Sequence, residues 1–188
     1  DNSIIIKSFY HTCANVPEYI ESALRSSEAK HGLYMMFKIL SEQRKASNKV
    51  ILQSGFISDI SGAIQLGNYF LKFLSPSAEE YDSFINTAFH NKQPKVFDVR
   101  NNPAANWLST VVEIYSSDKS NCAVLTSDVE RGALLRLLRG VKKPGGWIPK
   151  GEIAVGQIPH HGSQKNHVAE FWRVWGKGEM ACSVGVNT

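Results

Sequence analysis

Two stretches decide the fold, NCAVLTSDVE at residues 121–130 and AVGQIPHHGSQKNH at residues 154–167. In each, a short apolar run of strand type stops at a polar residue that can bind a metal ion. The first run stops at Asp128 and the second at the adjacent pair His160 and His161. Between them, residues 129–141 have leucines on one side and arginines on the other when placed on a helix, which is the spacing of an amphipathic helix. A strand–helix–strand unit of this length predicts a crossover between two parallel strands.

The carboxyl ends of two such strands meet at one edge of a sheet, where the polar side chains would converge. The residues after the histidines suit that edge. Gly162 permits a tight turn, and Ser163 is predicted to cap the next helix. We therefore expect Asp128, His160 and His161 to lie together, within reach of one ion.

This pattern resembles a known family. A strand running into T-S-D, followed by a strand that ends in P-H-H-G-S, is similar to the C-terminal half of metallo-β-lactamase-fold hydrolases, above all the branch of the DNA-uptake protein ComEC. The segments NWLS at 106–109 and LSPS at 74–77 are also similar to that branch, so the resemblance covers roughly residues 50–188. It implies an α/β fold, a metallo-β-lactamase-like αββα sandwich. Residues 1–188 would be a single domain, the C-terminal portion of that fold, incomplete in this chain.

The resemblance also implies a dinuclear site with two divalent metal ions, zinc before manganese or iron. Asp128 takes the position of the bridging carboxylate, and His161 and His160 are the metal-ligating and catalytic histidines. We favour His161 on the metal and His160 at the substrate phosphate or leaving group, although the sequence does not order them. The alternative for Asp128 is a helix N-cap, a position that aspartate also favours.

One departure from the family is clear. The principal metal motif, H-x-H-x-D-H, is absent, because no two of the six histidines are separated by one residue. Three explanations compete. The missing ligands come from an upstream segment, or from a partner chain, or the site is degenerate and the domain only structural. We favour the first, and expect the chain alone to bind metal weakly and not to turn over substrate.

Composition bounds the setting. Hydrophobic residues make up 43% of the 188, which is enough for a sizeable core and excludes a disordered chain. No apolar run approaches the roughly 18 residues of a membrane span, so no membrane partner is expected. The three cysteines have no close spacing, which favours a reducing compartment. We predict a soluble, cytoplasmic protein.

The predicted function is that of a metal-dependent hydrolase, a phosphodiesterase or nuclease whose site is completed from outside this chain. A net charge of +4 permits a nucleic acid or another phosphodiester as substrate. A basic group beside the site could contact phosphates, although an ordinary solvated surface explains it equally: Arg136, Arg139, Lys142, Lys143 and Lys150, with Trp147. The competing prediction is a non-catalytic interaction module on a degenerate scaffold.

The remaining elements follow from periodicity and turn residues. Ser77 and Glu80 form a capping box for a helix over 78–89. The helix after Ser163 is expected to pack through Val168, Phe171, Trp172 and Trp175. An unpaired edge strand is expected at 3–9. Other helices are predicted at 17–24 and 28–46, and other strands at 50–52, 69–74, 110–115, 122–125, 153–158 and 180–186.

Overall fold

The structure, a computed structural model, describes residues 8–11, 53–90, 106, 108–141, 147–175 and 178–183. The chain divides into two compact units, residues 1–57 with 86–103 and residues 58–85 with 104–188. The single domain predicted over residues 1–188 stays a prediction. No helix among the described residues is long and apolar enough to cross a bilayer.

In the first unit, strands β1 (Ser8–His11) and β2 (Gln53–Phe56) pair in parallel. Of the sheet edge expected to be unpaired at 3–9, only residues 8 and 9 are described. There β1 pairs with β2 on one side, Phe9 opposite Ser54, and the described residues place no strand on its other side. Gly55 lies inside β2, opposite Tyr10. The helices predicted at 17–24 and 28–46, and the strand at 50–52, fall outside the described residues.

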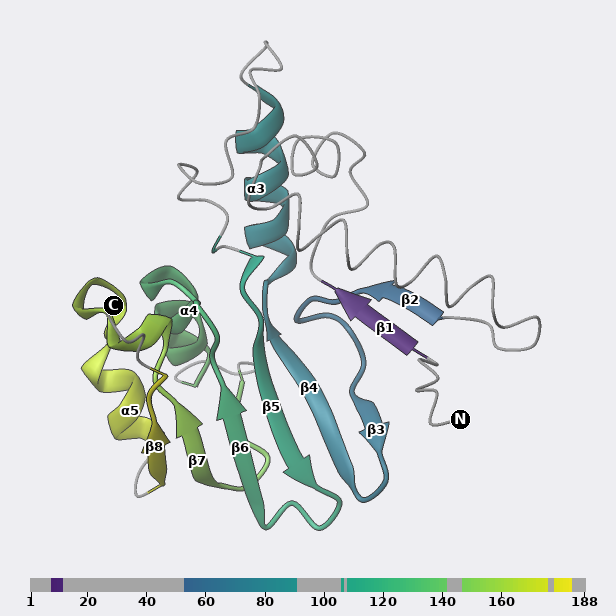
Figure 1. Cartoon of the computed structure of the whole chain (residues 1–188), viewed down its shortest axis with the longest axis vertical. Coiled ribbons are helices and arrows are strands. Elements are labelled where there is room, and N and C mark those ends of the chain that lie inside the picture. The colour runs from purple at the N-terminus through teal and green to yellow at the C-terminus, as the bar shows by residue number, and fades with distance from the viewer. Residues whose placement is uncertain are drawn as a thin grey trace, which may run out of the picture. The chain divides into compact units, whose positions relative to one another are not determined.

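The second unit is built on a six-stranded mixed sheet in the order β3-β4-β5-β6-β7-β8 (Figure 1). Neighbours from β3 to β6 are antiparallel, whereas β6, β7 and β8 run parallel. This confirms the α/β class. The strands at 69–74, 110–115, 122–125 and 153–158 are confirmed, and β3 was not predicted. The strands of this six-stranded sheet are β3 (Ile64–Leu66), β4 (Tyr69–Ser75), β5 (Val111–Ser116), β6 (Asn121–Leu125), β7 (Glu152–Gln157) and β8 (Glu179–Ala181).

Helix α3 (Ala78–His90) begins with the predicted capping box. The Ser77 backbone N–H donates to Glu80 Oε2 (2.8 Å), and the Glu80 N–H donates to Ser77 Oγ (3.1 Å). Reciprocal bonds of this kind satisfy two of the backbone donors that a helix leaves free at its start. The local sequence therefore sets where this helix begins.

Helix α4 (Arg131–Val141) joins β6 to β7, which are parallel neighbours, so the predicted crossover is confirmed. The last helix, α5 (Ala169–Trp175), does not begin at Ser163 as predicted. Two short 3₁₀ turns come first, at His160–Gly162 and Gln164–Asn166, and the Ser163 side chain caps neither. The prediction that Ser163 caps the next helix is therefore wrong. Val168 and Phe171 are buried as expected.

One face of the sheet carries the core. Directly opposed residues in a sheet point to the same face, and the register lines up Tyr115, Cys122 and Ile153 on this side. Helices α4 and α5 bury their apolar residues against it, and Leu134 and Phe171 are fully buried. We call this side the covered face. Its buried residues are Leu74, Val111, Cys122, Val124, Val129, Ala133, Leu134, Leu137, Leu138, Trp147, Ile153, Val168 and Phe171.

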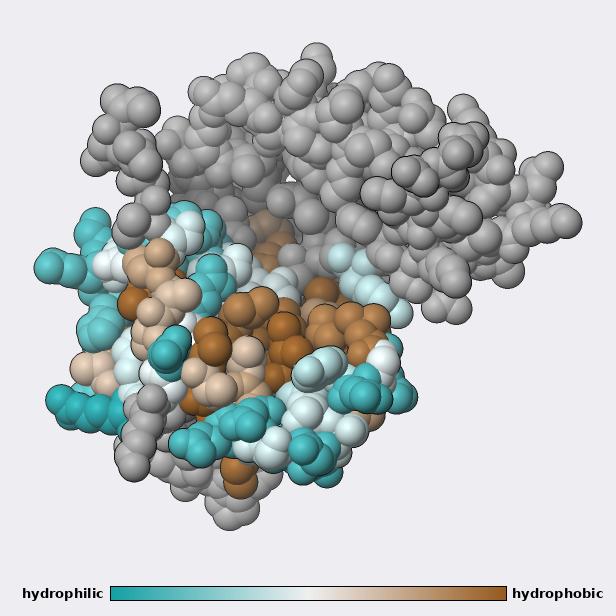
Figure 2. Space-filling view, turned by 60° about the horizontal axis from the view of Figure 1, so that its bottom comes forward, coloured by the Kyte–Doolittle hydropathy of each residue, from teal (hydrophilic) through white to brown (hydrophobic). Residues whose placement is uncertain are grey.

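The opposite side, which we call the open face, is also apolar. One cross-strand row runs over all six strands, and its first five residues are apolar. Leu66 and Tyr69, paired beside that row, are each 57% exposed. Apolar residues gather in one patch of the space-filling view, bordered by polar ones (Figure 2). The row comprises Ile64, Leu71, Ile114, Ala123, Val155 and Glu179.

Candidate functional site

The loops that leave β6 and β7 are held together by Gln157. Its side-chain oxygen Oε1 accepts from the backbone N–H groups of Thr126 and Ser127, both at 3.0 Å. The Thr126 hydroxyl, fully buried, donates to the Gln157 carbonyl (2.8 Å). The His160 N–H donates to the Ser127 carbonyl (3.0 Å). The two motifs T-S-D and P-H-H-G-S thus form one hydrogen-bonded unit, at the sheet edge that the sequence predicts.

The backbone of this unit is unusual at three positions. Ser127 (φ 49°), His160 (φ 47°) and His161 (φ 54°) all adopt left-handed conformations, which non-glycine residues rarely do. Gly162 (φ 79°) follows them at lower steric cost. Such conformations cost on the order of 1–3 kcal/mol each and persist only where surrounding contacts impose them. Two of the three strained positions, His160 and His161, are residues that the sequence singles out, and the third, Ser127, directly precedes Asp128.

Asp128 and His161 come together across the two loops. Their side chains approach to 3.4 Å between Asp128 Oδ1 and His161 Nε2, and both are about half exposed. The other ring nitrogen of His161, Nδ1, lies 2.8 Å from the Ser183 carbonyl oxygen. A carbonyl oxygen only accepts hydrogen bonds, so Nδ1 carries the proton. In the neutral ring, Nε2 then directs a lone pair toward the carboxylate.

Two acceptors facing each other at this distance repel unless a cation lies between them. A proton is one such cation and a metal ion is another. In a tetrahedral site with ligand bonds of about 2.0–2.1 Å, two ligands stand about 3.4 Å apart. A histidine that ligates a metal usually donates its second ring N–H to a carbonyl or carboxylate, as His161 does to Ser183. The 3.4 Å distance therefore fits a metal ion as well as a proton between the two side chains. Within the described ranges, no group of three or more His, Cys, Asp or Glu side chains could hold a metal ion.

His160 is held differently. Its Nδ1 lies 2.7 Å from Asn166 Nδ2. The orientation of that amide follows from its other end, where Asn166 Oδ1 accepts from the backbone N–H of Arg131 (3.4 Å). The amide nitrogen must then be the donor to His160, which leaves the ring proton of a neutral His160 on Nε2. The two histidines lie with ring centroids 6.3 Å apart and planes at 88°. His161 presents a lone pair and His160 an N–H.

The structure decides between the alternatives for Asp128 and His167 and adds two residues to the site. Asp128 lies three residues before Arg131, the first residue of α4, which is too early for the N-cap position of that helix. His167 has an exposed side chain, as predicted. Gln157 and Asn166 were not singled out, because a single amide at the end of a strand or in a turn carries no periodicity or motif that would mark it. Only the folded structure reveals that each amide bridges two loops.

The predicted basic group is partly committed to internal contacts. Arg136 donates to Glu80 through Nε (2.9 Å) and Nη2 (3.1 Å), to the Leu74 carbonyl (2.9 Å), and pairs with Asp59 at 3.8 Å. Trp147 is buried and its Nε1 donates to Glu113 (3.1 Å). Neither side chain is available for a phosphate or base. Arg139 and Lys150 are exposed, and residues 142 and 143 lie outside the described residues.

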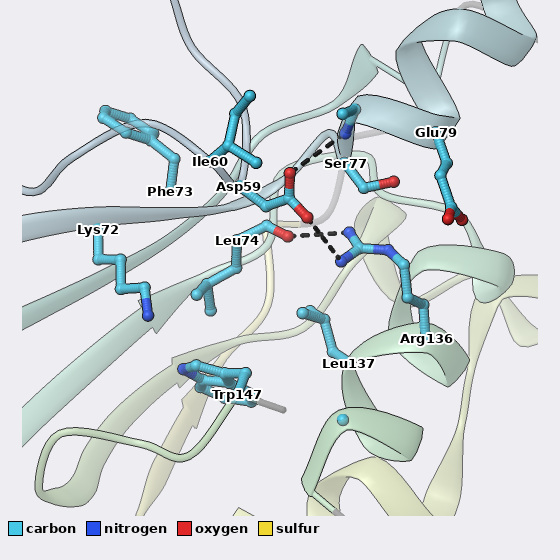
Figure 3. Close-up of a pocket in the computed structure, with 12 residues that line it drawn as sticks. Asp59, Ile60, Lys72, Phe73, Leu74, Ser77, Glu79, Arg136, Leu137 and Trp147 are labelled. Carbon is cyan, nitrogen blue, oxygen red and sulfur yellow. Dashed lines mark hydrogen bonds and ion pairs between the residues drawn. The ribbon is translucent and has the colours of Figure 1, made fainter. Parts of the chain in front are cut away.

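A pocket of about 520 Å³ lies beside Arg136, lined by β4, the start of α3 and α4 (Figure 3). Two of its charged groups, Asp59 and Arg136, are paired with each other. Asp59 accepts from the Ala78 N–H (3.1 Å) and faces Arg136, which also binds the Leu74 carbonyl. Asp128, His160 and His161 are not among the residues that line it. The pocket is therefore distinct from the candidate site, and its charged groups hold α3 and α4 to the sheet.

The candidate site is thus a pair of loops at the carboxyl ends of β6 and β7, with one carboxylate and two differently oriented imidazoles. Comparisons of the chain with models of known families, with curated proteins and with solved structures find no match.

Proposed function

We propose that the protein is a metal-dependent hydrolase of phosphodiesters, of the metallo-β-lactamase type, with nucleic acid as the leading substrate class. The observation that carries the proposal is the approach of Asp128 Oδ1 to His161 Nε2, at 3.4 Å, while the other ring nitrogen of His161 lies 2.8 Å from the Ser183 carbonyl oxygen. Two divalent ions, zinc before manganese or iron, would supply an activated water and Lewis-acid stabilisation when bound. Asp128 and His161 would hold metal, and His160 would contact the substrate at its phosphate or leaving group.

The residues of this chain divide the work. The Ser183 carbonyl orients the His161 ring so that Nε2 faces the metal position. His160 donates its Nε2–H to a phosphate oxygen or to the leaving-group oxygen, where negative charge grows during hydrolysis. Gln157 keeps both loops in register through its bonds to Thr126 and Ser127. A net charge of +4 favours approach of a polyanion.

We further propose that the sheet is one half of an αββα sandwich, with a second sheet of the same fold on the open face. The apolar row across five strands supports this, because none of its five apolar residues is fully buried and an apolar face of that extent normally packs against another layer. Leu125 and Val155 on that face are 41% and 42% exposed. The second layer, from an upstream segment or a partner chain, would also bring the remaining metal ligands.

The test is metal content and hydrolysis of bis(p-nitrophenyl) phosphate, measured on the complete protein with Asp128→Ala and His161→Ala. Each substitution removes a ligand at a half-exposed loop, so both variants should stay folded, lose bound metal and lose activity. His167→Ala is the matched control, an exposed histidine in the same segment. Full activity in either ligand variant would rule out that residue's role. The present chain alone should hold little metal.

The competing function, a non-catalytic interaction module, draws on the same open face. The two are separated by the metal content of the complete protein. About two equivalents of zinc, manganese or iron support the hydrolase. A protein without metal, which still assembles through the open face, supports the module.

A further inference from the structure

The side-chain amide of Asn166 makes contacts in the candidate site that the sequence does not suggest. Asn166 lies in the short turn Gln164–Asn166, between the histidines and α5. Its side chain joins two elements of the site, since Oδ1 accepts from Arg131 at the start of α4 and Nδ2 donates to His160 Nδ1. The donor contact to His160, at 2.7 Å, is the shorter of the two.

The backbone of His160 is fixed independently of this contact. Its N–H donates to the Ser127 carbonyl (3.0 Å), and its carbonyl accepts from the Ser163 N–H (2.9 Å). These bonds place the Cα atom but leave the ring proton undetermined. A neutral imidazole carries its proton on Nδ1 or on Nε2, and the hydrogen bond at one nitrogen selects the state of the other. At His160 that bond comes from Asn166.

We infer that Asn166 is a positioning residue that keeps the His160 proton on Nε2, so that His160 donates to substrate and does not ligate metal. This inference rests on the proposed function for its catalytic consequence, but not for the tautomer itself. It assigns unlike roles to two adjacent histidines through two unlike neighbours. Ser183 offers an acceptor to His161, and Asn166 offers a donor to His160.

Asn166→Asp provides a sharp test, because the carboxylate is isosteric with the amide. An aspartate oxygen can still accept from the Arg131 N–H, but no atom remains to donate to His160. The ring proton should move to Nδ1, where the carboxylate accepts it. Nε2 would then present a lone pair to the substrate phosphate. The expected result is a fall in kcat of about 10- to 100-fold, with metal content unchanged.

The matched control is Gln164→Glu, which makes the same amide-to-carboxylate change at an exposed position of the same turn. Tautomers are measured from ¹⁵N chemical shifts of the His160 ring in the complete labelled protein, and kcat, KM and metal content on the same samples. The inference predicts an Nε2–H ring in the wild type and in Gln164→Glu, and an Nδ1–H ring in Asn166→Asp. The kcat of Gln164→Glu should stay near that of the wild type.

Three results would overturn the inference. The wild-type ring could carry its proton on Nδ1, which is decided even where the variant does not fold. Asn166→Asp could leave the tautomer unchanged. The tautomer could change while kcat matches that of Gln164→Glu, which would remove the positioning role. A complete protein without metal or hydrolysis would instead defeat the proposed function, and the ring spectrum would still decide what Asn166 does.

Discussion

The two faces of the six-stranded sheet have similar apolar composition and opposite environments. On the covered face, Val124 of β6 and Leu134 of α4 are fully buried in one apolar cluster. On the open face, Leu125 is the next residue along β6 after Val124 and is 41% exposed. Alternation along a strand places these neighbours on opposite sides. This sheet is therefore apolar on both sides, as expected for a sheet packed between two layers.

Matched leucine truncations give the largest contrast between the faces. Leu134→Ala should lower the free energy of unfolding by about 2–5 kcal/mol, because a fully buried leucine leaves a cavity. Leu125→Ala should cost about 1 kcal/mol or less in the same chain, because much of its surface already contacts water. Urea unfolding of both variants measures the difference. Equal large losses would mean that the open face is packed in solution.

The buried carboxylate of Glu113 gives a second, smaller contrast. Glu113 is fully buried on the covered face, where it accepts from Trp147 Nε1 (3.1 Å) and from the Lys150 N–H (2.6 Å). Glu113→Gln would turn an NH₂ group toward one of these donors and cost about 1–3 kcal/mol. Glu152→Gln, at an exposed position of β7, is the control. The two variants are compared by urea unfolding with Trp fluorescence, and equal costs would deny Glu113 its structural role.

Thiol labelling tests the burial of the covered face without a mutation, because one cysteine lies there and another is exposed. Cys122 lies on the covered face, and burial, followed by the nearby Glu113 charge, raises the pKa of its thiol from 9.0 to about 11. Cys182 is exposed. At pH 8 a thiol reagent should modify Cys182 quickly and Cys122 only after unfolding, as read by mass spectrometry. Rapid labelling of both thiols in the folded protein would contradict the burial of the covered face.

The same raised pKa fixes the sign of a pH effect. The folded protein holds the Cys122 proton up to about pH 11, whereas the unfolded chain releases it near 9.0. The contribution of the protonated Cys122 thiol to the free energy of unfolding is therefore fully present below pH 9 and is lost as the pH rises toward 11. Cys122→Ser removes the thiol, and its unfolding free energy should depend less on pH in this window.

Much of the fold could be predicted from local sequence. The capping box of Ser77 and Glu80 sets the start of α3 through bonds three residues apart. Apolar periodicity located α4 and the strands on either side of it, because burial on one face imposes that spacing. The sequence also placed Asp128 and His161 at one sheet edge, since parallel strands joined by a crossover end on the same side. These are properties of short segments and of connection geometry.

Other features were decided only by tertiary structure. The left-handed turn at His160 and His161 delays α5 until Ala169, because bonds to Ser127 and Ser163 hold the backbone in a shape that no propensity predicts. Which ring presents a lone pair and which an N–H depends on partners distant in sequence. Ser183 lies 22 residues from His161, and Asn166 lies 6 residues from His160. Sequence patterns determine which residues reach the sheet edge. Hydrogen-bond partners brought there from distant segments determine which ring nitrogen carries the proton, and therefore what each histidine can do.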